Sequence, residues 1–284
     1  MKTKLTALYG LKYNPFTPDV PITAIHVYTS LENFCWRAES NFIREGGFAL
    51  ISGDPGTGKS VVLRLLANKL SQLRDVQVGV LTHPSARLSD FYRELGDIFG
   101  VPLNAHNRWN SFKTLRERWQ SHLDSTLLHP VLFIDEAQEM PICVLNELRL
   151  MTSTQFDSRT LLSIVLAGDQ RLNDKLRLDD LIPLGSRIRF RFNTEYASRD
   201  QLMQSLTYLL AEAGNPNLMT KELMQTLCDH AMGNYRVLCT MANELLTTAA
   251  IQEKAQLDEK LYLECFAVKP PVRKQKNTSG GARG

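Results

Sequence analysis

The sequence has no apolar run that approaches the roughly 20 residues of a membrane-spanning helix. Its first residues, Met1 to Lys4, lead into no signal-peptide core. The C-x-x-C and H-E-x-x-H patterns are also absent, so neither a disulfide framework nor a zinc site is indicated. These absences predict a cytoplasmic protein that has no contact with a membrane.

Neither sign of charge is in large excess. Lys and Arg together number 33 and Asp and Glu 30, which gives a formal net charge of +3. This balance permits an anionic polymer as a partner without requiring one. The length of 284 residues is enough for one α/β domain and a smaller second domain, each with its own core.

A phosphate-binding pattern, G-x-x-x-x-G-K-[ST], is met without a mismatch by residues 53–60. These residues are Gly53, Asp54, Pro55, Gly56, Thr57, Gly58, Lys59 and Ser60. An apolar run at 48–51 precedes them as an expected strand, and a helical pattern follows from Val61. Lys59 is predicted to reach the β/γ-phosphates of ATP and the Ser60 hydroxyl to bind Mg²⁺. The loop and the start of the helix, including Val61, are therefore the predicted ATP site.

A second motif consists of an apolar strand at 131–134 followed by Asp135 and Glu136. The position after a strand places both carboxylates at the carboxyl edge of the sheet, where open α/β folds bind ligands. Asp135 is predicted to hold Mg²⁺ through its water shell. Glu136 is predicted to orient or deprotonate the water that attacks the γ-phosphate.

The remaining pattern predicts an α/β core followed by helices. Further strands are expected at 76–81, 161–168 and 186–192, and helices at 30–44, 88–99, after 107, at 171–181, from 198, from 220 and following 233–236. Residues 186–192 alternate with period two, which predicts one face of arginines (Arg187, Arg189, Arg191) and one apolar face (Ile188, Phe190, Phe192). We divide the chain into an N-terminal arm (1–30), the α/β core (31–195), a helical lid (196–268) and a basic, disordered tail (269–284).

Two segments allow alternative interpretations. Residues 8–18 could be an arm packed on the domain, or Tyr13, Pro15 and Phe16 could form a wall for the adenine. The helix after 107 mixes cations with aromatic residues, which fits a solvated helix face or a nucleic-acid surface.

These motifs together resemble the AAA+ ATPases. Over residues 8–266 the chain is similar to the ExeA-like group, which includes transposition ATPases of the TnsC, MuB and IstB kind. The runs at 9–16 and 133–138 carry this closer resemblance. It implies a P-loop NTPase fold with a five-stranded parallel sheet in the order 5-1-4-3-2, a C-terminal α-helical lid, and ATP bound between subunits.

The resemblance also implies roles for single residues. Arg187 matches the arginine finger that one subunit supplies to its neighbour, and Arg236 matches sensor 2 on the lid. Asp169 occupies the sensor 1 position, where a neutral polar side chain is usual. A carboxylate near the γ-phosphate would repel it unless it were turned away or bridged, so Gln170 is the alternative sensor.

Three functions are compatible with such an ATPase. The first is a regulator of DNA transposition that uses ATP and Mg²⁺, oligomerises on duplex DNA and recruits a transposase or target-selector protein. Its DNA contacts are predicted at Arg87, Lys113, Arg116 and Arg118. The second is a secretion-associated ATPase of the ExeA type, and the third is a protein-remodelling AAA+ ATPase.

Overall fold

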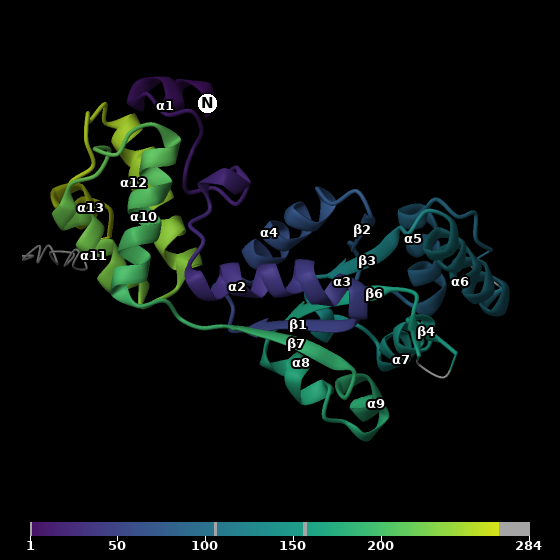
Figure 1. Ribbon diagram of the computed structural model, residues 1–284. Helices are drawn as coiled ribbons and strands as arrows, with labels where there is room; N and C mark the ends of the chain where they lie inside the picture. Colours follow the sequence, from purple (N-terminus) through teal and green to yellow (C-terminus); the bar gives the residue numbers. More distant parts are fainter. Residues whose placement is uncertain (1, 105–106, 156–157, 267–284) are drawn as a thin grey trace, which may run out of the picture.

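The computed structural model describes the chain except residues 1, 105–106, 156–157 and 267–284. The predicted basic tail therefore lies outside the described residues. Figure 1 shows two bodies, an α/β body around a sheet and a smaller body of helices. Among the described residues, no helix is both long and apolar enough to cross a bilayer.

The sheet of the α/β body has five parallel strands, as predicted. Their order across the sheet is β2 (Val76–Leu81), β3 (His129–Ile134), β6 (Ser163–Gly168), β1 (Gly47–Gly53) and β7 (Ile188–Thr194). Numbered along the chain, this is the predicted order 5-1-4-3-2 read from the other edge. Two short antiparallel strands of two residues each, β4 (Ser153–Thr154) and β5 (Arg159–Thr160), pair with each other outside the sheet.

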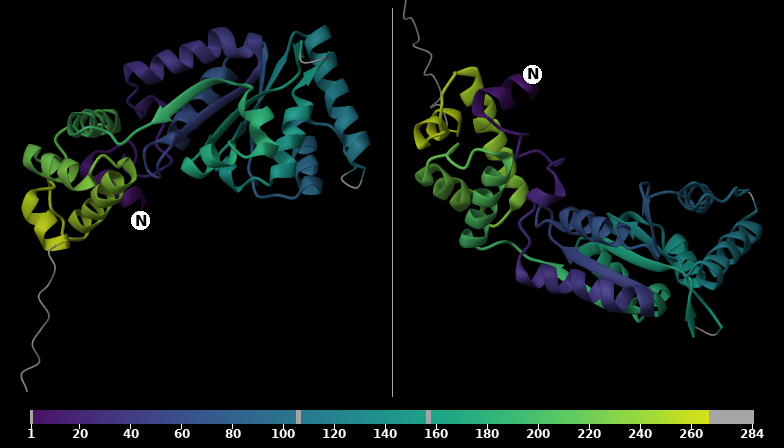
Figure 2. Two further views of the ribbon diagram at one scale, coloured as in Figure 1. Left: turned by 90° about the horizontal axis from the view of Figure 1, so that it is seen from below. Right: turned by 45° about the horizontal axis from the view of Figure 1, so that its top comes forward.

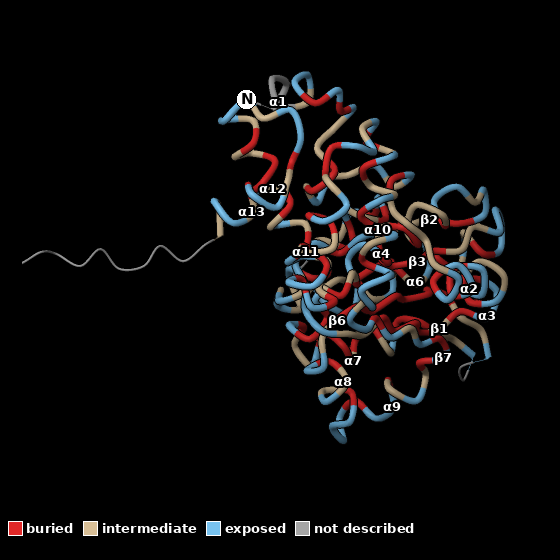
Figure 3. Tube along the Cα trace, turned by 90° about the vertical axis from the view of Figure 1, so that its left-hand side faces the viewer, coloured by how far each residue is buried: buried red, intermediate tan, exposed pale blue. Residues whose placement is uncertain are grey.

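Helices cover both faces of the sheet, which explains why its strands are almost uniformly apolar. Along β6, Ile164 and Val165 point into different hydrophobic clusters. One face packs on α5 (Leu88–Phe99), α6 (Arg108–Ser125) and α7 (Ile142–Met151). The opposite face packs on α2 (Thr29–Arg37) and α4 (Lys59–Ser71). Buried positions accordingly run through the centre of the body in Figure 3.

The predicted alternation of 186–192 is interrupted in the structure. Ile188 packs in the cluster with α5 to α7, whereas Phe190 packs in the cluster with α2 and α4. A register shift opposite Phe48 and Ala49 places an extra residue in β7, and such a bulge exchanges the two faces of a strand. The prediction of one continuous apolar face on this strand is wrong.

Two predicted helices are divided. The first, at 30–44, consists of α2, a π-helical turn (Ala38–Phe42) and α3 (Ile43–Glu45). The prediction of a single helix over 171–181 is wrong. The structure has α8 (Gln170–Lys175), a 3₁₀ turn (Asp179–Leu181) and α9 (Ile182–Gly185). Leu178, between α8 and the 3₁₀ turn, has an extended backbone, so one continuous helix cannot pass through it.

The helical body contains α10 (Arg199–Ala213), α11 (Lys221–Ala231), α12 (Tyr235–Ile251) and α13 (Glu259–Phe266). The N-terminal helix α1 (Lys2–Tyr9) lies beside α12 in Figures 1 and 2. The Tyr9 hydroxyl donates to the Lys254 carbonyl at 2.9 Å, and Asn14 Nδ2 donates to Asn243 Oδ1 at 2.7 Å. The N-terminal segment thus packs on the helical body.

Candidate active site

The phosphate loop connects β1 to α4 at the carboxyl edge of the sheet. Gly56 and Gly58 have φ of +84° and +102°, values that side chains rarely adopt. A Cβ atom at Gly56 would also clash with the Asn234 side chain, and one at Gly53 would clash with Thr194. The glycines therefore allow both the curved backbone and the close approach of β7 and the lid.

Lys59 is the first residue of α4, and its side chain turns back into the loop. Its Nζ donates to the carbonyls of Gly53 at 2.9 Å and Asp54 at 3.0 Å. The residue is buried. Two carbonyls of the loop thus hold the ammonium group against the loop itself.

Ser60 and Asp135 supply the oxygen atoms that Mg²⁺ prefers. Ser60 is exposed in the first turn of α4, and Asp135 follows β3, two strands away from β1 at the same edge of the sheet. No group of three or more His, Cys, Asp or Glu side chains in the described ranges could hold a metal ion.

Asp169 is engaged by its own helix. Its Oδ1 caps α8 by accepting from the Arg171 N–H at 2.9 Å, and Arg171 Nη2 lies 2.8 Å from Oδ2. The hydrogen bond from Arg171 is the main cause that holds the pKa of this carboxyl below its usual range, and Lys59 contributes to the same direction. The repulsion expected at the sensor 1 position is therefore offset by a cation. Gln170, the alternative sensor, is exposed at the start of α8.

The lid contacts the phosphate loop through the start of α12. Asn234 Nδ2 donates to the Pro55 carbonyl at 3.1 Å, and the Tyr235 N–H donates to the Gly56 carbonyl at 3.1 Å. Arg236 is exposed in the first turn of α12, next to these contacts. The sequence predicted a helix start here, but the bonds to a loop 179 residues away have no local signal.

The aromatic residues predicted near the adenine belong to the helical body. Phe16 is buried in its core, and Tyr13 packs against that core from the edge. The packing of the arm is thus the interpretation for which the structure provides direct contacts. A wall for the adenine stays a prediction.

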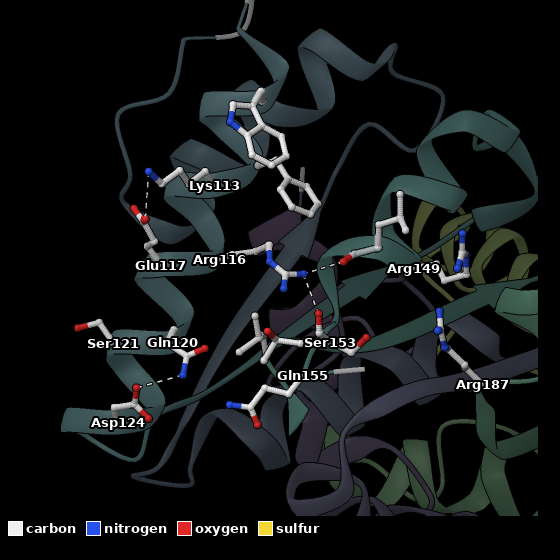
Figure 4. A pocket seen from close by; sticks show the side chains of 15 residues that line it. Lys113, Arg116, Glu117, Gln120, Ser121, Asp124, Arg149, Ser153, Gln155 and Arg187 are labelled. Atoms are coloured by element: carbon white, nitrogen blue, oxygen red, sulfur yellow. Dashed lines mark hydrogen bonds and ion pairs between the residues drawn. The ribbon is translucent and has the colours of Figure 1, made fainter. Parts of the chain in front are cut away.

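Arg187 lies at the start of β7, at the opposite end of the sheet from the phosphate loop. The neighbouring pair is Phe48 and Ile188 at the beginning of both strands, whereas the loop follows Gly53. Six residues of parallel strand separate the two ends by about 20 Å. Arg187 faces a groove of about 980 Å³ between α6, α7 and β4 (Figure 4).

The four predicted DNA contacts differ in their surroundings. Arg116 donates to the carbonyls of Leu150 at 2.8 Å and Ser153 at 2.7 Å, so its guanidinium binds the end of α7 (Figure 4). Lys113 lies 3.7 Å from Glu117, and both side chains are exposed. Arg87, before α5, and Arg118, on α6, are exposed as well.

The fold and the loop define this protein as an α/β P-loop NTPase. A family model described as an AAA domain matches residues 43–176. The segment 43–176, which contains the phosphate loop, Asp135 and Glu136, therefore matches an AAA domain, and this P-loop NTPase match is consistent with ATP hydrolysis.

One curated relative and two solved structures show what the chain is similar to. It is 28% identical over 250 residues to general secretion pathway protein A of Aeromonas hydrophila, with 86% of this chain and 44% of that protein covered. The chain thus spans less than half the length of this relative. The structure of Cdc6p of Pyrobaculum aerophilum matches with a TM-score of 0.71 at 17% identity. The match covers 90% of this chain and 72% of the Cdc6p chain. The structure of the ORC1 protein of Aeropyrum pernix in complex with DNA matches with a TM-score of 0.65 at 18% identity. The match covers 87% of this chain and 67% of the ORC1 chain.

Proposed function

We propose that this protein is an ATP-dependent regulator of DNA transposition that assembles on duplex DNA and recruits a transposase or target-selector protein. The observation that supports assembly into an oligomer is the separation of Arg187 from the phosphate loop of its own chain. Arg187 begins β7 about 20 Å of strand away from the loop, which is further than an arginine side chain extends, so it does not reach the nucleotide of its own chain. It can complete the site of an adjacent copy, so hydrolysis is coupled to assembly.

The site residues have complementary roles in this proposal. Lys59 binds the β/γ-phosphates, and Ser60 and Asp135 hold Mg²⁺, which neutralises phosphate charge when bound. Glu136 accepts the proton of the attacking water. Arg187 of a neighbouring copy and Arg236 of the lid stabilise the negative charge on the phosphoryl group.

Two observations support DNA as the partner. The ORC1 protein of Aeropyrum pernix was solved in complex with DNA, which indicates that this fold is compatible with a DNA-bound state. Lys113 is available to phosphates because its ion pair with Glu117 is solvent-exposed, and such pairs are weak. Arg87 and Arg118 are exposed for the same contact.

Co-sedimentation with duplex DNA, with and without ATP, tests this function. We expect binding that needs ATP, depends little on sequence, and loses about one unit of log–log salt slope for each phosphate contact removed. Lys113→Glu and Arg87→Glu should weaken DNA binding and leave the ATP affinity of the monomer unchanged. If deletion of 269–284 removes all DNA binding and neither charge reversal has an effect, the predicted surface is wrong.

The similarity to general secretion pathway protein A favours a second candidate, a secretion-associated ATPase. This function requires no DNA. A protein that assembles with ATP but never binds duplex DNA, and whose gene lies among secretion genes, would support the second candidate. Transposase genes beside it would support the first.

A further inference from the structure

The segments that follow β3 and β6 are fastened to each other by side chains to which the proposed mechanism gives no role. Lys175 Nζ, on α8, donates to the Gln138 carbonyl at 2.7 Å. Arg171, also on α8, lies 3.0 Å from Glu139 and 2.8 Å from Asp169. Gln138 is buried at 6% exposure in the 3₁₀ turn Ala137–Glu139. These contacts hold the region beside Glu136 in one arrangement.

Both ends of the Gln138 amide are bonded, and the bonds determine its orientation. Its Oε1 accepts from the Asp169 N–H at 3.3 Å. Because an N–H group requires an acceptor, the oxygen must face Asp169, and Nε2 must then face Glu136. A Cβ atom at Gly168 would lie 2.6 Å from Oε1, so the glycine at the end of β6 permits this approach.

Glu136 has a backbone conformation that directs its side chain to this amide. Its φ of +51° is uncommon for a residue other than glycine, and such conformations concentrate at functional sites. Gln138 Nε2 donates to Glu136 Oε2. One carboxylate oxygen is therefore held in place, and the direction of the other oxygen, Oε1, is restricted.

We propose that Gln138 is a positioning residue for ATP hydrolysis. It holds Glu136 Oε2 so that Oε1 is directed at the attacking water, and it connects this carboxylate to the backbone after β6. The proposal rests on the proposed role of Glu136 as the base. In the step, the water oxygen bonds to the γ-phosphorus as the bond to the bridging oxygen breaks, with its electron pair staying on ADP. A proton of the water passes to Glu136 Oε1.

Three substitutions separate the two bonds of the amide. Gln138→Met keeps the length of the side chain and removes both bonds. Gln138→Glu keeps an acceptor for the Asp169 N–H but removes the donor to Glu136. Gln138→His can keep both, since a neutral imidazole has one donor and one acceptor nitrogen.

We expect Gln138→Met and Gln138→Glu to lower kcat by about 10- to 100-fold, the effect of a misplaced catalytic group. ATP affinity, measured with a fluorescent analogue, should stay within about twofold, because the two hydrogen bonds of the amide go to Glu136 and Asp169 and not to the phosphate loop. Gln138→His should retain most of the turnover. Melting temperatures of all three variants show whether the fold is retained.

A double-mutant cycle tests whether Gln138 acts through Glu136. In the Glu136→Gln background, Gln138→Met should cause no further loss of residual turnover. A further loss, or a gain of turnover in Gln138→Met alone, would overturn the inference. Normal turnover in both Gln138→Met and Gln138→Glu, with Glu136→Gln inactive, would overturn it and leave the proposed function intact. Normal turnover in Glu136→Gln would refute the base assignment itself.

Discussion

At the scale of single residues, Lys59 is the clearest case for substitution. Lys59→Ala should weaken ATP binding by about 10- to 100-fold, because it removes a charged donor to the phosphates. Nucleotide-dependent assembly of this variant on its own should be lost as well. Titration with a fluorescent ATP analogue measures the affinity. Lys69→Ala is the matched control. Lys69 lies on the same helix but at its other end, where its Nζ is 3.7 Å from Glu39 Oε1. Similar affinities for the two variants would disprove the site assignment.

The residues of the site differ in how far the sequence could predict them. The phosphate loop and Asp135 with Glu136 are contiguous motifs, so their positions are recognisable without tertiary contacts. Gln138 and Asn234 act through partners from other segments, Asp169 and Pro55. Such contacts depend on which strands are neighbours and where the lid is placed. No local pattern contains that information.

At the scale of helices and strands, boundaries were predictable where the chemistry is local. The bounds of α5 agree with prediction because Gly100 adopts the left-handed conformation that ends a helix. The lid helices begin after Ser198, Thr220 and Asn234, whose side chains accept from backbone N–H groups. The division between α8 and α9 was missed, because it depends on how leucines of both parts reach the core.

Helix α6 allows a test of structural and functional cations on one element. Arg116→Ala should lower the free energy of unfolding by about 1–3 kcal/mol, because two carbonyls lose a charged donor. Lys113→Ala should change it by less than about 0.5 kcal/mol, since its pair is exposed. Urea denaturation measures both. Equal stability of the two variants would contradict the structural role of Arg116.

At the scale of the whole molecule, the position of Arg187 makes activity a property of the assembly. Arg187→Ala and Lys59→Ala should each be inactive alone. Mixed in equal amounts, they should recover part of the ATPase activity at interfaces where an intact loop faces an intact arginine. A mixture of Arg187→Ala with Arg187→Ala/Lys59→Ala is the control, because no interface in it is complete.

Recovery should depend on the ratio of the two proteins and peak at intermediate mixtures. Absence of recovery at every ratio, with both variants folded and able to associate, would argue against a site shared between subunits. It would also remove the main support for coupling between hydrolysis and assembly.

Contacts with the phosphate loop place the junction between the two bodies beside the candidate ATP site. Strand β7 ends at Thr194, whose hydroxyl lies 2.6 Å from that of Thr57 in the loop, and α10 begins only at Arg199. The connection between the two bodies, residues 195–198, therefore lies beside the phosphate loop. Helix α12 starts beside the same loop and is about 25 Å long, so a rotation of about 10° about its start would move its far end by about 4 Å. A small change of angle at the phosphate loop would therefore become a larger displacement at the far end of the helical body.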